Sequence, residues 1–214
     1  MNKYETHFKR PYELLDKTIE SVISGGNQVL DLGSSSGTVA SMVDRHHRNC
    51  LVHCVDIDKE SLGRIEEHPL DSTRTLSYPS DTNEFLTSSG LSGLDAITIN
   101  ATLHEINNPS NQRDYLRFFL ESCKEKMKES GSIVVGDYYY PPHVSDEDVA
   151  EYMRQQLEEI GHADSREKFV LPSLIWEMVL ESGLYVTKQI EIPAVKGIDR
   201  RYYNIIIRGK ENGN

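Results

Sequence analysis

VLDLGSSSGTVA, residues 29–40, runs an apolar segment into a turn of small residues and then into a segment with helical spacing. The apolar part is typical of a buried strand. Gly33 and Gly37 lack a Cβ, so the backbone of the turn can approach a ligand closely. A turn that opens a helix also presents its backbone N–H groups at the positive end of that helix. The stretch therefore predicts a ligand-binding turn; the alternative is a tight turn that only packs strand against helix.

Two carboxylates stand at positions suited to a nucleoside. Asp31 comes just before the turn, where it can accept hydrogen bonds, and Asp56 ends the next apolar segment, nineteen residues after Gly37. An acid about 20 residues after such a turn is typical of a grip on ribose hydroxyls. The NAD fingerprint would need glycines at positions 33, 35 and 38, but Ser35 and Thr38 stand at two of them, so NAD is disfavoured.

Strand-like and helix-like segments alternate through the first 140 residues, which predicts a parallel sheet with helices on both faces. Strands are expected at 27–33, 51–58, 75–78, 94–103 and 132–140, and helices at 11–24, 38–46, 59–67, 81–88 and 110–128. Pro11 suits the first turn of the first helix, and Gly131 is expected to close the last one.

The alternation of strands and helices ends after Pro141-Pro142. A polar helix is expected at 145–160, another helix from Pro172 to Gly183, and an antiparallel hairpin from the strands 184–192 and 202–208, because their connection is short. The chain 1–214 is expected to be one domain. Within it, residues 141–170 form a lid insertion over the carboxyl edge of the sheet. Residues 1–26 form a helical cap, whose Tyr4, His7 and Tyr12 cover the cofactor, or else a frayed terminus.

The turn resembles the first motif of the class I S-adenosylmethionine-dependent methyltransferases, an acid-x-Gly-x-Gly-x-Gly turn. It stands here as Asp31-Leu32-Gly33-Ser34-Ser35-Ser36-Gly37, with Ser35 in place of the middle glycine. The resemblance covers about residues 25–210. It implies a Rossmann-like three-layer α/β sandwich with a mostly parallel seven-stranded sheet, whose seventh strand lies antiparallel beside the fifth. It also implies S-adenosyl-L-methionine as the cofactor.

The resemblance assigns roles to individual residues. Asp56 would hold the ribose, Ile57 would pack on the adenine, and Asp81 falls where the family often faces the adenine amino group. The cofactor-binding residues expected in all are Asp31, Gly33, Ser34, Ser35, Gly37, Asp56, Ile57, Asp81 and Asn100.

The ends of the fourth and fifth strands are expected to face the methyl acceptor, because ligands of parallel sheets sit at the carboxyl ends of the strands. His104 follows the fourth strand. It is either a base for a hydroxyl or amine, or a structural histidine that shapes the cofactor loop. Tyr138, Tyr139, Tyr140 and His143 follow the fifth strand and either line the acceptor pocket or pack the strand end.

No metal site is expected. His104-Glu105 opens a metalloprotease-like pattern, but position 108 is Asn rather than His. Among the other candidate zinc ligands, Cys50 and Cys54 should point to one face of a strand and His53 to the opposite face, so they cannot converge.

Composition narrows the function. The formal net charge of −11 gives no general attraction to phosphate backbones, so a small-molecule acceptor is favoured over nucleic acid. Three cysteines and a polar start without an apolar core predict a cytoplasmic protein without a membrane span, and the tail from Lys210 is expected to be disordered. The predicted function is methyl transfer to a small molecule by direct displacement.

Three alternatives stay open. They are a tRNA-modifying methyltransferase, an enzyme that uses a modified, carboxylated adenosylmethionine, and a cofactor-binding protein without catalysis. A basic residue near Tyr138 would favour the carboxylated donor, and the sequence shows no obvious one.

Overall fold

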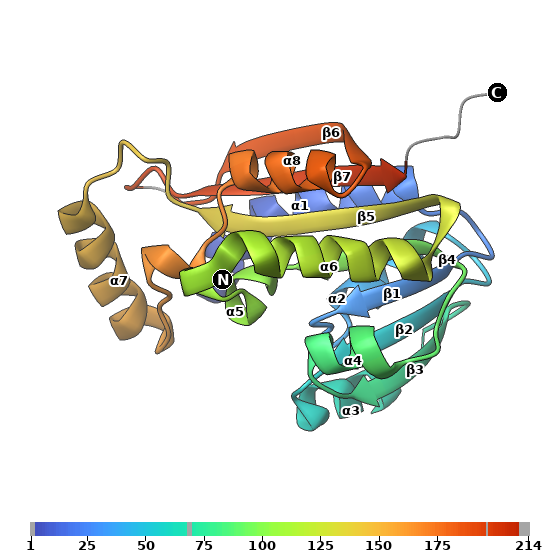
Figure 1. Ribbon diagram of the computed structural model, residues 1–214. Helices are drawn as coiled ribbons and strands as arrows, with labels where there is room; N and C mark the ends of the chain where they lie inside the picture. The colour runs from blue at the N-terminus through green and yellow to red at the C-terminus, as the bar shows by residue number, and fades with distance from the viewer. Residues whose placement is uncertain (1–2, 68–69, 196, 210–214) are drawn as a thin grey trace.

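A seven-stranded sheet runs through the centre of the computed structural model, which describes residues 3–67, 70–195 and 197–209 (Figure 1). Its strands lie in the order β3-β2-β1-β4-β5-β7-β6. The first five pair in parallel, whereas β7 lies antiparallel between β5 and β6. The strands are β1 (Gln28–Leu32), β2 (Leu51–Asp56), β3 (Arg74–Pro79), β4 (Leu94–Asn100), β5 (Met127–Tyr139), β6 (Leu184–Pro193) and β7 (Arg201–Gly209). The predicted mostly parallel sheet with an antiparallel C-terminal hairpin is confirmed.

Helices cover both faces of this sheet and complete the three-layer sandwich (Figure 1). One face is covered by α1 (Lys3–Val22), α2 (Thr38–His46) and α3 (Lys59–Glu67), and the other by α4 (Thr82–Ser88), α6 (Gln112–Lys126) and α8 (Pro172–Glu181). The single-turn α5 (Leu103–Ile106) follows β4, and the short 3-10 helices η1 (Pro109–Asn111) and η2 (Arg166–Lys168) precede α6 and α8. α7 (Asp146–Ile160) lies beyond the carboxyl end of β5.

Alternation along the strands divides the core into two layers, because successive side chains of a strand point to opposite faces. Leu30, Ile97 and Ile133 are buried under α6 and α8, whereas Val29 and Val134 are buried under α1 and α2. The insertion 141–170 belongs to the first of these layers, since its apolar side chains are buried there: Val144, Val149, Tyr152, Phe169 and Val170. The segment predicted to be a lid is thus also part of the core.

The first helix begins earlier than the sequence predicts. α1 starts at Lys3, so Pro11 lies inside the helix rather than in its first turn. Proline removes one backbone donor there. Packing compensates, because Phe8 stacks on Tyr12 and meets the edge of Tyr138, with ring centroids 6.0 Å and 6.1 Å apart.

Gly131 does not close the fifth predicted helix. α6 ends at Lys126, and Gly131 lies inside β5. The pairing of β5 with β4 shifts register between Leu94 and Ala96, and a Cβ on Gly131 would lie 3.0 Å from the carbonyl oxygens of Leu94 and Lys128. The glycine therefore serves an irregularity of the sheet rather than a helix end.

Two expectations concern residues or side chains outside this description. The tail from Lys210 lies outside the described residues, and so do the side chains of Tyr4 and His7. Within the described ranges, no helix has the length and apolar character that crossing a membrane would require.

Candidate functional site

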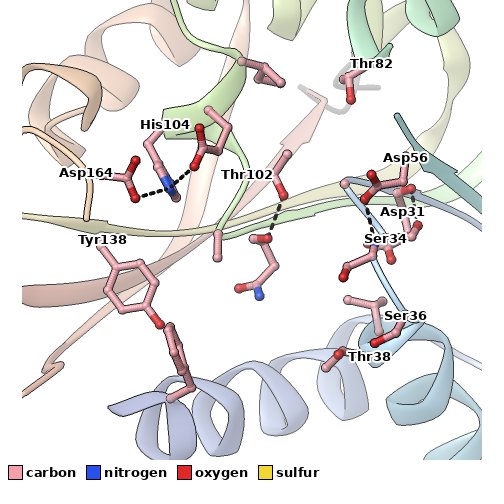
Figure 2. A pocket seen from close by; sticks show the side chains of 18 of the residues that line it. Asp31, Ser34, Ser36, Thr38, Asp56, Thr82, Thr102, His104, Tyr138 and Asp164 are labelled. Atoms are coloured by element: carbon pink, nitrogen blue, oxygen red, sulfur yellow. Dashed lines mark hydrogen bonds and ion pairs between the residues drawn. The ribbon is translucent and has the colours of Figure 1, made fainter. Parts of the chain in front are cut away.

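A cavity of about 650 Å³ opens where β1, β2, β4 and β5 end at their carboxyl termini (Figure 2). This volume falls in the range of small-molecule sites. We distinguish two ends of the cavity. The glycine-turn end is lined by Asp31, Gly33, Ser34, Ser35, Asp56, Ile57 and Asp81, and the lid end by His104, Glu105, Tyr138, Gln156, His162, Asp164 and Arg200. Thr102 lies between them (Figure 2), and Asn100, the last residue of β4, also lines the cavity.

Gly33 brings the chain of the turn against neighbouring backbone. It has a φ of +75°, and its N–H and that of Ser34 both donate to the carbonyl of Val55, at 2.8 Å and 3.0 Å. A Cβ at position 33 would lie 2.1 Å from Thr102 Oγ1. Only glycine fits both constraints, so the turn is held tightly between β2 and the end of β4.

Ser35 adopts the left-handed conformation that the missing middle glycine would favour. Its φ is +46°, and its N–H donates to Asp56 Oδ2 at 2.7 Å. The other oxygen of Asp56 accepts from the N–H of Asp58 at 2.8 Å. Asp56 thus ties the turn to the end of β2 and still has lone pairs that can accept hydrogen bonds from a ligand.

Asp31 is a buried carboxylate with one unused oxygen. Oδ1 accepts a hydrogen bond from Thr98 Oγ1 at 2.7 Å, whereas the buried Oδ2 has no hydrogen-bond partner. Burial raises the pKa of Asp31 to about 6, because desolvation disfavours the ionised form. An ammonium group in the cavity would supply the missing partner.

Two further residues predicted to contact the adenine, Ile57 and Asp81, lie at the glycine-turn end, where the adenine of a bound cofactor could reach them. Ile57 is 78% exposed and lines the cavity. Asp81 lines it too, and its carboxylate caps α4 by accepting from the N–H groups of Asn83 and Glu84. Gly37, the N-cap residue of α2, does not line this cavity; a Cβ there would lie 2.9 Å from Ile65.

His104 is clamped by an acid that sequence analysis missed. Asp137, on β5, is fully buried, and its carboxylate accepts hydrogen bonds from the backbone N–H of His104 at 2.8 Å and from the ring Nδ1 at 2.7 Å. It also accepts from the N–H of Tyr138 at 2.7 Å. The ring Nε2 lies 3.5 Å from Asp164, which comes from the insertion (Figure 2). His104 therefore joins β5 to the segment over the cavity.

The two acids decide the charge of this histidine. Burial alone would lower the pKa of His104, but the charges of Asp137 and Asp164 and their hydrogen bonds outweigh it and raise the pKa to about 10. Burial would raise the pKa of Asp164, but hydrogen bonds from His104 and Lys168 hold it below its usual range. His104 is thus an imidazolium at neutral pH, which makes it a hydrogen-bond donor rather than a base.

One group at the lid end has donor atoms close enough to hold a metal ion. The ligand atoms of His104, Glu105 and Asp164 lie within 4.8 Å of one another. Lys168 Nζ already stands between the two carboxylates, 3.1 Å from Glu105 and 2.9 Å from Asp164. The ammonium and the imidazolium supply positive charge where a metal would, so we assign no metal here.

The residues expected to line the acceptor pocket separate in the structure. Tyr138 lines the cavity, whereas Tyr139, Tyr140 and His143 do not. Tyr139 donates its hydroxyl to Glu191 on β6 at 2.6 Å, and the exposed His143 pairs with Asp199 at 3.0 Å. The ring of Tyr140 is buried. Alternation along β5 explains the difference between Tyr138 and Tyr139.

Arg200 is the second residue that sequence analysis missed. It precedes β7, is 6% exposed, and lies with its guanidinium carbon 4.5 Å from the ring centroid of Tyr138. The sequence offered no obvious basic residue near Tyr138, because 62 positions separate Arg200 from Tyr138. The antiparallel register, in which Arg201 faces Tyr139, would have located it.

Solved structures share this architecture over nearly the whole chain. A candidate sarcosine dimethylglycine methyltransferase from Galdieria sulphuraria is 14% identical, with a TM-score of 0.64 over 93% of this chain and 85% of that one. A SAM-dependent methyltransferase from Aquifex aeolicus is 16% identical, with a TM-score of 0.60 over 96% of this chain and 93% of that one. The chain has the fold of the S-adenosylmethionine-dependent methyltransferases.

A third structure extends this methyltransferase fold to the full length of both chains. The N-methyltransferase NodS from Bradyrhizobium japonicum is 14% identical, with a TM-score of 0.62 over 99% of this chain and 100% of that one. No protein-family model matches the chain, and no curated protein matches it by sequence. The likeness therefore lies in the fold, and the chemistry must be argued from the residues of the cavity.

Proposed function

We propose that this chain is an S-adenosylmethionine-dependent methyltransferase that acts on a small molecule. The observation that carries the proposal is the glycine-turn end of the cavity. There a buried carboxylate oxygen of Asp31 has no partner, Gly33 leaves no room for a side chain, and Asp56 presents a carboxylate at the end of β2. These features suit the ammonium group, the close approach and the ribose hydroxyls of that cofactor.

Each residue has a definable task in this proposal. Asp31 pairs with the ammonium of the amino-acid moiety, Asp56 accepts hydrogen bonds from the ribose hydroxyls, and Ile57 packs on the adenine. Bound S-adenosylmethionine supplies a methyl group that its sulfonium has already activated. The protein's task is then to orient the acceptor, and alignment of reacting groups is worth about 7–11 kcal/mol.

His104 has a positioning role in this proposal. A histidine with a pKa of about 10 has no free lone pair to take a proton at neutral pH. Its contacts with Asp137 and Asp164 instead fix the insertion over the lid end. The acceptor is therefore proposed to be a group that reacts without a histidine base.

Binding and transfer are tested separately. Calorimetry should show binding of S-adenosylmethionine and S-adenosylhomocysteine but not of NAD; the reverse result would refute the cofactor assignment. Labelled methyl donor with fractionated cell extract should then label a small molecule, identified by mass. Label in RNA, with binding weakened by salt, would favour the tRNA alternative. Binding without any transfer would favour a cofactor-binding protein.

A further inference from the structure

Arg200 is a buried cation with no counter-ion. In the part of the chain that the structure describes, its guanidinium forms no ion pair or hydrogen bond, and its Nε atom is buried without a partner. A guanidinium has five N–H donors and stays charged in proteins. Because taking an unpaired ion out of water is unfavourable, such a group is expected to have a partner that the chain does not supply.

Four aromatic rings surround this cation. Their centroids lie 4.5 to 5.8 Å from the guanidinium carbon, and they belong to Tyr138, Phe169, Tyr140 and Tyr152. Cation–π attraction offsets part of the desolvation. It leaves the buried Nε–H without an acceptor, however, and the hydroxyls of Tyr140 and Tyr152 are also buried without partners. The surroundings therefore hold Arg200 but do not satisfy it.

The backbone fixes Arg200 in place. Its N–H donates to the carbonyl of Ile198 at 2.9 Å, and its carbonyl accepts from the N–H of Ala194 at 2.8 Å. Both bonds lie in the connection between β6 and β7. A side chain held at a rigid position and surrounded by rings is preorganised for one ligand geometry.

Arg200 lies far from the turn that would hold the cofactor. In the sheet, β4 and β5 separate β1 from β7, so three strand spacings of about 4.8 Å set the two ends roughly 14 Å apart. Among the described residues that line the cavity, Arg200 is also the one lysine or arginine, whereas Asp31, Asp56 and Asp81 line the opposite end. Glu105 and Asp164 also line the lid end, but Lys168 pairs with both, so among the residues described there Arg200 is the charge that lacks a partner. The lid end thus favours an anionic ligand group, and the glycine-turn end favours a cationic one.

We propose that Arg200 binds a carboxylate at the lid end, carried by the molecule that accepts the methyl group. The inference rests on the proposed function, which it narrows to anionic acceptors. A guanidinium presents two parallel N–H donors that match the two oxygens of a carboxylate. Tyr138, which lines the cavity, would flank the rest of the acceptor. The same carboxylate could instead belong to a carboxylated donor, the alternative that a basic residue near Tyr138 favours. The distance of Arg200 from the glycine turn favours the acceptor, and the experiments below separate the two.

Three variants isolate the charge of Arg200. Arg200→Met removes the charge and keeps an unbranched chain, and Arg200→Lys keeps the charge but loses the planar pair of donors. Arg201→Met is the matched control, because that neighbour pairs with Asp199 and does not line the cavity. Arg200→Met should fold with an unchanged or higher Tm, since it removes an unpaired buried charge. A lower Tm with unchanged carboxylate binding would mean a structural role and would overturn the proposal.

Equilibrium binding tests the site without catalysis. The protein is titrated with benzoate and with the neutral benzamide, both alone and saturated with S-adenosylhomocysteine. Benzoate should bind the wild type and Arg201→Met alike and at least tenfold more weakly to Arg200→Met, while benzamide should not distinguish them. Equal binding of the two probes by the wild type would overturn the proposal. Because the titration also runs without the cofactor product, its result does not depend on the methyltransferase assignment.

The labelled product identifies the source of the carboxylate. With S-adenosylmethionine and extract, the methylated product should carry a free carboxyl group, identified by mass after esterification, and Arg200→Met should raise the KM for the acceptor at least tenfold while the Kd for S-adenosylmethionine stays within twofold. A product without a carboxyl group, or a tenfold loss of S-adenosylmethionine affinity in Arg200→Met, would overturn the proposal. Transfer of a carboxymethyl group from a carboxymethyl-sulfonium donor, seen by mass, would assign the carboxylate to the donor and overturn the acceptor assignment.

Discussion

The two ends of the cavity are built in different ways. The glycine-turn end comes mostly from one continuous turn after β1 and from the end of β2, within residues 31–57, with Asp81 added from the start of α4. The lid end brings together His104, Asp137, Asp164 and Arg200, which belong to four distant segments. The first is encoded locally, and the second exists only in the folded chain. In this protein the chemistry that would select the acceptor is therefore the less local of the two.

The ends also differ in how their charges are compensated. At the glycine-turn end, Asp31 has no cationic partner and its pKa is raised to about 6 by burial. At the lid end, the His104 imidazolium lies between Asp137 and Asp164, and Lys168 neutralises Asp164 further. Arg200 alone stays unpaired there among the described residues. Among the described residues, the charges without an oppositely charged partner are thus negative at the glycine-turn end and positive at the lid end.

The largest effect is expected at the lid end from Asp137→Ala. The change leaves three N–H donors without their acceptor and weakens the pairing of a buried imidazolium. Breaking a buried ion pair by removing one partner costs about 3–5 kcal/mol, so the free energy of unfolding in urea should fall by that amount. Glu177→Ala, which breaks an exposed pair with Arg113, is the control and should lower the free energy of unfolding far less, because solvent screens exposed ion pairs. A loss for Asp137→Ala as small as the control's would contradict the role given to the clamp.

The same contrast explains what the sequence could predict. The strand–turn–helix unit, Asp31 and Asp56 were found because the motif is contiguous and the acid follows at a fixed distance. Asp137 and Arg200 carry no such local signal, since their role depends on β7 pairing with β5. Tyr139 and Tyr140 were grouped with Tyr138 by sequence proximity, although neither shares its place in the cavity lining.

Asp56→Ala should have the next largest effect, and only at the glycine-turn end. Losing charge-assisted hydrogen bonds to the ribose, and the tie to Ser35, should weaken binding of S-adenosylhomocysteine by about 1.5–3 kcal/mol in calorimetry. The matched control is Asp58→Ala, because Asp58 bonds Ser61 and the N–H of Glu60 instead. Unchanged affinity in a folded Asp56→Ala would show that Asp56 is not the ribose ligand.

Asp31 should make cofactor binding depend on pH. Its carboxyl must ionise to pair with an ammonium, and its pKa of about 6 means that roughly a tenth is ionised at pH 5. Binding of S-adenosylhomocysteine should therefore be about tenfold weaker at pH 5 than at pH 7.5. Asp31→Asn should bind weakly with no such dependence, and a wild-type affinity that is flat over this range would contradict the pairing.

The stability of the protein gives an independent test of the raised pKa of Asp31. Its pKa is raised on folding, so the protonated form stabilises the fold fully below about pH 4, and this stabilisation is lost as pH rises through about 6. Asp31→Asn should accordingly have a higher Tm than the wild type above pH 6 in the absence of cofactor. The pH dependence of binding and the Tm of Asp31→Asn together would show that the buried Asp31 carboxylate lowers the stability of the fold and strengthens cofactor binding.

The smallest effect is expected on turnover at His104, where a histidine that acted as the base would produce a large effect. If His104 took a proton from the acceptor, its pKa of about 10 would make turnover rise about tenfold per pH unit across neutral pH. As a positioning group, His104 should give no such rise.

An amine acceptor can titrate on its own, so the matched variant is His104→Gln, which keeps a side-chain donor for Asp137. Any rise in turnover that is due to the acceptor persists in this variant. Turnover of His104→Gln should fall less than tenfold, with the same pH profile as the wild type, and a chelator should change neither. A pH-dependent rise that is present in the wild type and absent from His104→Gln would make His104 the base, and the lid end would then hold a catalytic residue as well as the residue that selects the acceptor.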